Sequence, residues 1–143
     1  MQFDKETQQR ILRVAGQRIE GQDVDEIDER IVHVMDLHPE YNAIWEMGEM
    51  AVYPQEIDGK VVNPFVHTVL HVTVDKQIQD ENPEFVAENF RRLIKDGADE
   101  HEALHGIIGI YADLYFRTFR KGDTFSNLDY QSELENLFLS GEK

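Results

Sequence analysis

The chain contains no cysteine among its 143 residues, and this absence excludes two kinds of site. Disulfide bonds and thiolate-ligated metal centres both need cysteine, so any metal ion must be held by nitrogen and oxygen ligands. The sequence also lacks an apolar run near the roughly 20 residues of a membrane-spanning helix, and its first residues lack the apolar core of a signal peptide. We therefore expect a cytoplasmic protein with no membrane partner.

Basic residues are scarce: 14 Lys and Arg stand against 29 Asp and Glu, which gives a formal net charge of −15. A surface this negative repels phosphate backbones, so we expect no nucleic-acid partner. The hydrophobic fraction of 41% and the charged fraction of 30% are typical of a globular protein that buries its own core. The length predicts one α-helical domain over residues 1–143, and it leaves a homodimer open.

Apolar residues recur with helical spacing along most of the chain. Asn63–Pro64 and Asn82–Pro83 each pair a capping side chain with a proline suited to the first helical position, and Asp99 is a third cap. Gly97 and Gly122 predict helix ends. The helices predicted from these signals span residues 7–19, 25–38, 39–47, 63–79, 82–96, 99–121 and 126–139.

The stretch from residue 52 to residue 62 does not follow the helical pattern. Asp58-Gly59 lies between Ile57 and Val61, which is a signal for a two-residue hairpin turn. Two strands alone are only marginally stable, so we interpret this stretch as an excursion from a helical fold. The predicted fold class is all-α: a compact bundle of about six helices with a small loop or β-hairpin near residues 52–62.

Two histidine pairs share the same spacing. His67 and His71 form one H-x-x-x-H pattern, and His101 and His105 form another. For six histidines in a chain of this length, chance predicts about 0.2 such pairs. Side chains four residues apart share one face of a helix, so each pair can reach one metal ion. Both pairs fall on apolar stripes, so we expect all four imidazoles to face the interior and to converge.

A divalent cation would explain such a cluster, because it keeps each buried ring neutral and uses its lone pair. His38 is a further candidate ligand, since it continues the apolar stripe of residues 25–38; it can equally cap that helix, which Pro39 should end. Glu46, Glu49 or Glu102 could complete a mixed nitrogen and oxygen site. The predicted cofactor is one transition-metal ion, zinc first, with iron or nickel as alternatives.

Residues 101–105 also match H-E-x-x-H, the pattern in which zinc proteases use the glutamate as a general base. On that interpretation Glu102 would be a catalytic residue. However, no histidine follows His105 to serve as a third ligand, and the chain offers little strand to align a substrate. Asp99 and Glu102 also have capping-box spacing, which gives Glu102 a plainer role at the start of a helix.

Three segments together resemble an uncharacterised bacterial family, the domain of unknown function 1841. They are residues 38–41 (HPEY), 63–71 (NPFVHTVLH) and 99–105 (DEHEALH). The resemblance implies that the five histidines in these segments belong to the family pattern. It also implies no fixed glutamate after His101, which argues against a catalytic Glu102, and a histidine where Asn42 stands. Because the family is uncharacterised, the resemblance transfers positions and no activity.

The sequence leaves three functions open. The first is a helical metal-binding protein with one site built from the two histidine pairs. The second is a non-catalytic interaction module, in which the histidines bond to carboxylates or carbonyls and exposed aromatics such as Tyr130 or Phe138 contact a partner. The third is a metal-dependent hydrolase that uses Glu102. Whether the protein is an enzyme is undecided at this point.

Overall fold

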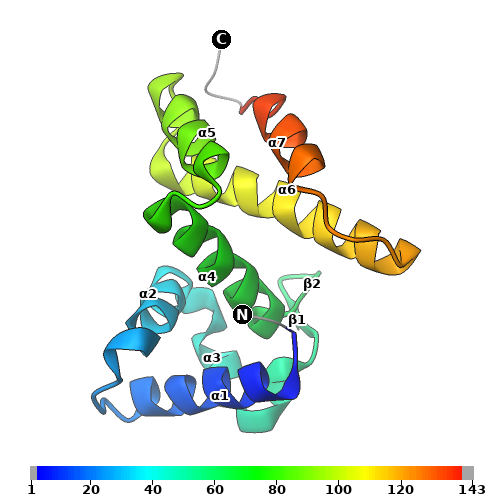
Figure 1. The fold of residues 1–143 in the computed structure, drawn as a ribbon. Coiled ribbons are helices and arrows are strands. Elements are labelled where there is room, and N and C mark those ends of the chain that lie inside the picture. The colour runs from blue at the N-terminus through cyan, green and yellow to red at the C-terminus, as the bar shows by residue number, and fades with distance from the viewer. Residues whose placement is uncertain (1–2, 140–143) are drawn as a thin grey trace. The chain divides into compact units, whose positions relative to one another are not determined.

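The computed structural model describes residues 3–139, which are mainly helical (Figure 1). Two short strands, β1 (Gln55–Ile57) and β2 (Lys60–Val62), pair in antiparallel fashion, and short 3-10 turns link several helices. The all-α prediction with a hairpin excursion is therefore confirmed. The helices are α1 (Lys5–Ile19), α2 (Glu29–Leu37), α3 (Asn42–Trp45), α4 (Pro64–Asp80), α5 (Glu84–Lys95), α6 (Glu100–Lys121) and α7 (Asn127–Glu135).

The chain forms two compact units, Met1–Val72 and Thr73–Lys143. The boundary lies inside α4, so this helix contributes its first residues to one unit and the remainder to the other. Each unit buries its own apolar residues. That the two units behave as one domain stays a prediction. Among residues 3–139, no helix is both long enough and apolar enough to cross a bilayer.

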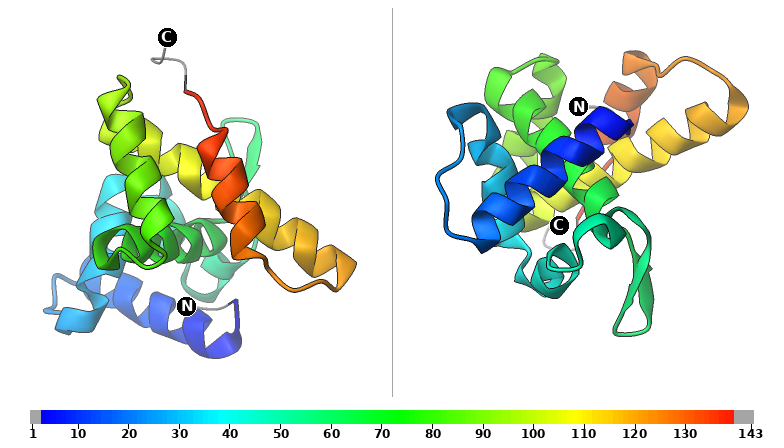
Figure 2. Two further views of the ribbon diagram at one scale, coloured as in Figure 1. Left: turned by 45° about the horizontal axis from the view of Figure 1, so that its top comes forward. Right: turned by 90° about the horizontal axis from the view of Figure 1, so that it is seen from below.

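The first unit is built around α1, which contacts both α2 and α3. The start of α4 completes its core, and Figure 2 shows the β1–β2 hairpin projecting from these helices. The turn between the strands has positive φ at both Asp58 (51°) and Gly59 (81°), the geometry that Asp-Gly favours in a two-residue hairpin. The core side chains include Ile11, Val14, Ile31, Val34, Ile44, Trp45, Phe65 and Val69.

The end of α2 follows from proline chemistry. Pro39 disfavours helical geometry at the preceding residue, and His38 has φ −127° and ψ 66°. The His38 backbone N–H still donates to the Met35 carbonyl at 3.1 Å, and a 3-10 turn over Pro39–Tyr41 follows. His38 is thus the C-cap of α2, as the sequence allowed.

Helix α4 begins where the sequence predicts. The Asn63 side chain accepts a hydrogen bond from the Val66 backbone N–H at 3.1 Å, and Pro64 is the first helical residue. The Asn63 amide also donates to the Val52 carbonyl at 3.3 Å, which ties the start of α4 to the preceding turn. The similar prediction for Asn82 as a cap is wrong: Pro83 is the N-cap of α5, and the Asn82–Pro83 peptide bond is cis.

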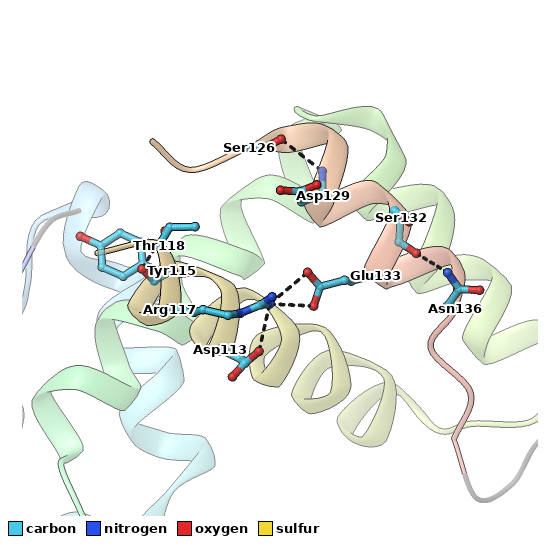
Figure 3. Close-up of polar contacts among 9 residues, drawn as sticks. All are labelled: Asp113, Tyr115, Arg117, Thr118, Ser126, Asp129, Ser132, Glu133 and Asn136. Atoms are coloured by element: carbon cyan, nitrogen blue, oxygen red, sulfur yellow. Dashed lines mark hydrogen bonds and ion pairs between the residues drawn. The ribbon is translucent and has the colours of Figure 1, made fainter. Parts of the chain in front are cut away.

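The second unit packs α5, α6 and α7 so that each helix contacts the other two (Figure 1). Arg117 of α6 joins α7 through Glu133, with its Nη2 3.1 Å from both carboxylate oxygens, and it also pairs with Asp113 at 3.1 Å (Figure 3). The shared core includes Val86, Leu93, Ile107, Ile108, Leu114 and Leu134.

Helix α7 ends earlier than predicted, at Glu135 instead of residue 139. The Arg92 guanidinium donates to the carbonyl of Leu134 in the last turn of the helix and to that of Leu137 just beyond it, at 3.1 Å each. The chain beyond lies against α6, where a Cβ at Gly106 would approach the side chains of Leu137 and Leu139 to 3.2 and 3.1 Å.

The expectation that Tyr130 is exposed is wrong, because its side chain is fully buried. Ser126 caps α7 and so sets its register, which places Tyr130 on the same face as the buried Leu134. The phenol donates to Gln77 at 2.7 Å, which satisfies the buried hydroxyl, and burial raises the pKa of Tyr130. Phe138, by contrast, is exposed as expected, with the Arg92 guanidinium 5.7 Å from its ring centroid.

The cap of α4 gives a testable prediction. We expect Asn63→Ala to lower the free energy of unfolding by about 1 kcal/mol, because the Val66 N–H loses its side-chain acceptor. Denaturant unfolding measures the change. Lys76→Ala, at an exposed position inside the same helix, is the control and should change stability by less than about 0.5 kcal/mol. A loss for Asn63→Ala as small as that of the control would contradict the role of this cap.

Candidate metal centre

Three histidines of the first unit meet around a common point. The His38 Nε2 atom lies 3.1 Å from His67 Nε2 and 3.3 Å from His71 Nδ1. One ligand atom from each of the three residues lies within 4.8 Å of the others. His38 and His71 are buried and His67 is half-buried. The structure therefore brings His67 and His71 together as predicted, and it places His38 between them.

These separations match those of nitrogen ligands on one small ion. Two nitrogens bound at about 2.0–2.1 Å in tetrahedral geometry lie about 3.3–3.4 Å apart. The rings also cross steeply, with interplanar angles of 87° for His38–His67, 70° for His38–His71 and 88° for His67–His71. Imidazole lone pairs lie in the ring planes, so crossed rings with adjacent nitrogens can direct those lone pairs to one point.

Hydrogen bonding alone is a poor account of this contact. A neutral imidazole has one N–H donor and one acceptor nitrogen. If His38 Nδ1 donates to a neighbouring carboxylate, its Nε2 has a single in-plane lone pair, yet two histidine nitrogens approach that atom. One lone pair accepts one well-aligned hydrogen bond, whereas a cation could be shared by all three rings. Charging the rings instead would place like charges in a buried site.

Local structure explains why these three side chains meet. His67 and His71 are four residues apart on α4, so they share one face of that helix. The His67 backbone N–H donates to the Asn63 carbonyl at 2.9 Å, which fixes His67 in the capped first turn. His38 reaches the same place because α2 stops at Leu37 and the chain turns at Pro39.

Two neighbours of His38 frame the cluster. Glu40 Oε2 lies 3.2 Å from His38 Nδ1, and the ring of Tyr41 stacks on that of His38 at 5.6 Å with an interplanar angle of 26°. Partial burial favours the neutral form of Glu40, but hydrogen bonds from its own backbone N–H and from His38 outweigh that effect and lower its pKa. Burial and then the Glu40 charge raise the pKa of Tyr41, so the phenol stays neutral at pH 7.

Glu40 is the carboxylate that contacts the histidine cluster, and no sequence pattern singles it out. The carboxylates expected as ligands are Glu46, Glu49 and Glu102, and all three are exposed. The available signal was the position of Glu40 two residues after His38, in a turn that Pro39 begins. Such a turn can bring a carboxylate back to the ring that precedes it.

Asn42 occupies the position where the family resemblance implies a further histidine. Its side-chain oxygen accepts a hydrogen bond from Arg18 Nη1 at 3.1 Å, and Arg18 also binds Asp36 at 2.8 Å. Asn42, Arg18 and Asp36 line an open cavity of about 390 Å³, together with Ile19 and Glu46. In this chain, position 42 thus serves a polar contact between α1 and α3.

The second predicted pair lies in the second unit, at the start of α6. His105 is half-buried, but His101 is exposed, so the expectation that both side chains face inward is wrong for His101. Their ring centroids are 4.1 Å apart with an interplanar angle of only 31°, which is closer to ring stacking than the crossed rings of α4. The physical reason is register: His101 lies in the first turn beside exposed Glu100 and Glu102.

Glu102 was a candidate catalytic base, and its backbone has a structural role. Its N–H donates to the Asp99 side chain at 2.8 Å, which confirms Asp99 as the N-cap of α6. The Glu102 side chain is exposed on the first turn of the helix. A catalytic role for Glu102 stays a prediction.

The Asp99 cap predicts a specific pH dependence. The hydrogen bond from the Glu102 backbone N–H holds the pKa of Asp99 below its ordinary value of 3.8. A lowered pKa in the folded state adds stability above that ordinary value, and this stability is lost as the pH falls through the lowered pKa. Asp99→Ala should therefore destabilise the protein near neutral pH, and its deficit relative to wild type should shrink in acid.

Denaturant unfolding at a series of pH values between about 2 and 7 measures this difference. Asp123→Ala, which removes an exposed carboxylate from the loop before α7, is the control for the loss of one negative charge. A deficit of Asp99→Ala that stayed constant down to the lowest pH would contradict the contribution of the ionised cap.

Comparison with known proteins identifies the family. The profile described as "Domain of unknown function (DUF1841)" matches residues 4–136, a range that includes all of the histidines discussed above. No curated protein and no solved structure matches the chain. The resemblance inferred from the three histidine-containing segments is confirmed, and the chain belongs to the domain of unknown function 1841 family.

Proposed function

We propose that this protein binds one transition-metal ion through His38, His67 and His71. The observation that supports the proposal is the separation of 3.1 and 3.3 Å between His38 Nε2 and its two histidine neighbours. Side chains from α4 and from the end of α2 supply these nitrogens, and all three rings are buried or half-buried. A cation in this position would bind the lone pairs of the rings, and this would offset the free-energy cost of burying three imidazoles together.

His101 and His105 lie in the second unit, and the proposed set of ligands does not include them. Three histidine ligands leave the fourth position of a zinc ion open, and water can occupy that position. The proposed function is therefore metal binding by the first unit. We propose no reaction.

Zinc is the proposed metal, with iron or nickel as alternatives. Imidazole ligands suit all three ions, and the absence of cysteine excludes thiolate ligation. The nitrogen separations lie near the tetrahedral value, and zinc is bound by four ligands in that geometry in structural sites. A cytoplasmic location and the lack of a nucleic-acid partner stay predictions. A homodimer stays possible as a prediction from the sequence.

Metal analysis of protein purified without a histidine tag tests the proposal. We expect close to one equivalent of bound zinc, or uptake of one equivalent by metal-free protein on titration. His71→Ala should weaken zinc binding by more than about 100-fold, since loss of a ligand should exceed the 10–100-fold effect of an outer hydrogen-bond partner. His33→Ala is the matched control, because His33 is an exposed histidine on α2.

Thermal unfolding with and without a chelator gives a second readout. Because zinc binds only the folded site, the wild-type melting temperature should fall when zinc is removed. The melting temperature of the His71→Ala protein should differ little with and without the chelator. Packing that is lost with the histidine lowers both melting temperatures equally, so it cancels in this comparison. Less than about a tenth of an equivalent of zinc, iron or nickel, with no uptake on titration, would overturn the proposal.

A further inference from the structure

We propose that Glu40 is a positioning residue that sets the metal affinity of the histidine site by fixing the tautomer of His38. The inference rests on the proposed metal site. In this arrangement the His38 Nδ1–H donates to the Glu40 carboxylate, so that the Nε2 lone pair points toward His67 and His71 and is available to a metal ion.

The distances support a directed contact. Glu40 Oε2 is 3.2 Å from His38 Nδ1, and the opposite ring nitrogen, Nε2, is the atom that lies 3.1 Å from His67 and 3.3 Å from His71. The two nitrogens of one ring therefore serve two purposes. One nitrogen can donate to a carboxylate, and the other can bind the cation. Histidine ligands commonly use the second ring nitrogen in this way.

The backbone holds the carboxylate in place. Glu40 lies in the 3-10 turn Pro39–Tyr41, where Pro39 has a fixed φ, and the Tyr41 backbone N–H donates to the His38 carbonyl at 3.0 Å. Tyr41 also restricts the ring of His38 by stacking on it, and its own ring meets that of His67 edge-on at 5.7 Å. Glu40 and Tyr41 thus limit the rotation of His38 from two sides.

Loss of the carboxylate has a predictable chemical consequence. Without Glu40, His38 can place its proton on Nε2, and that tautomer points an N–H instead of a lone pair at the other histidines. A hydrogen bond to a carboxylate also makes the opposite nitrogen more basic and hence a better ligand. The Glu40 side chain is 50% exposed, so water can replace part of the interaction. We therefore expect an effect near the lower end of the usual 10–100-fold range.

The test compares zinc affinities of full-length variants by competition with a chromogenic chelator. Glu40→Ala should weaken zinc binding by about 10-fold. Glu40→Gln keeps an acceptor oxygen but loses the charge, so it should lie between Glu40→Ala and the wild type. Glu46→Ala and Glu49→Ala remove exposed carboxylates of the same unit, and each should change the affinity by less than about 2-fold.

A second readout follows the tautomer directly. Nitrogen–proton NMR correlations of the imidazole side chains, recorded on metal-free protein, should show His38 protonated at Nδ1 in the wild type. Glu40→Ala should shift His38 toward protonation at Nε2, and Glu46→Ala should not. A purely structural role for Glu40 would not move this signal while the fold is retained.

The outcomes separate this inference from the proposed function. If wild-type protein binds no zinc, the proposed function fails, and with it the claim that Glu40 tunes metal affinity. If wild-type protein binds zinc but Glu40→Ala binds it equally well and His38 keeps its tautomer, the role of Glu40 is overturned while the metal site stands. If Glu46→Ala weakens zinc binding as much as Glu40→Ala does, general charge explains the effect and the inference is wrong.

Discussion

The close approach of three imidazole nitrogens is the constraint on which the functional account depends. His38 Nε2 lies 3.1 Å from one histidine nitrogen and 3.3 Å from another, in a region where two of the three residues are buried. Hydrogen bonds between neutral rings would have to share the one Nε2 atom of His38 between two partners, and charging all three rings would place like charges side by side. The same geometry is ordinary for ligands that share one ion.

Several elements of the first unit serve this contact. Pro39 ends α2 so that His38 leaves the helix, and the Asn63 cap fixes where α4 starts and hence where His67 and His71 point. Glu40 and Tyr41 follow His38 in one short turn, and their contacts with its ring limit the rotation of that ring. The family match over residues 4–136 covers all of these positions, but it carries no activity.

The fold was largely predictable because its signals are local. Helical periodicity, the Asn63 and Asp99 caps and the Asp58-Gly59 turn each depend on a few neighbouring residues, and the structure contains all of them. Two of the failures involve contacts distant in sequence. The chain leaves α7 after Glu135, where Arg92 from another helix binds carbonyls in and just beyond the last turn, and the burial of Tyr130 depends on how α7 packs. No local pattern encodes either fact.

The site was predictable in part for the same reason. Spacing alone placed His67 and His71 on one face of a helix, but it gave the same expectation for His101, which is exposed. The central position of His38 and its contact with Glu40 depend on how a turn after α2 meets α4, across about 30 residues of sequence. Periodicity describes one helix at a time, so it could suggest His38 as a ligand and could not place it.

X-ray absorption spectroscopy of the zinc-loaded, tag-free protein tests the central claim most directly, since it reports the ligands of the metal ion itself. The account predicts a shell of nitrogen ligands at about 2.0–2.1 Å, with the outer scattering pattern of several imidazole rings. A six-coordinate oxygen shell without imidazole scattering, or protein that retains no zinc to measure, would contradict it.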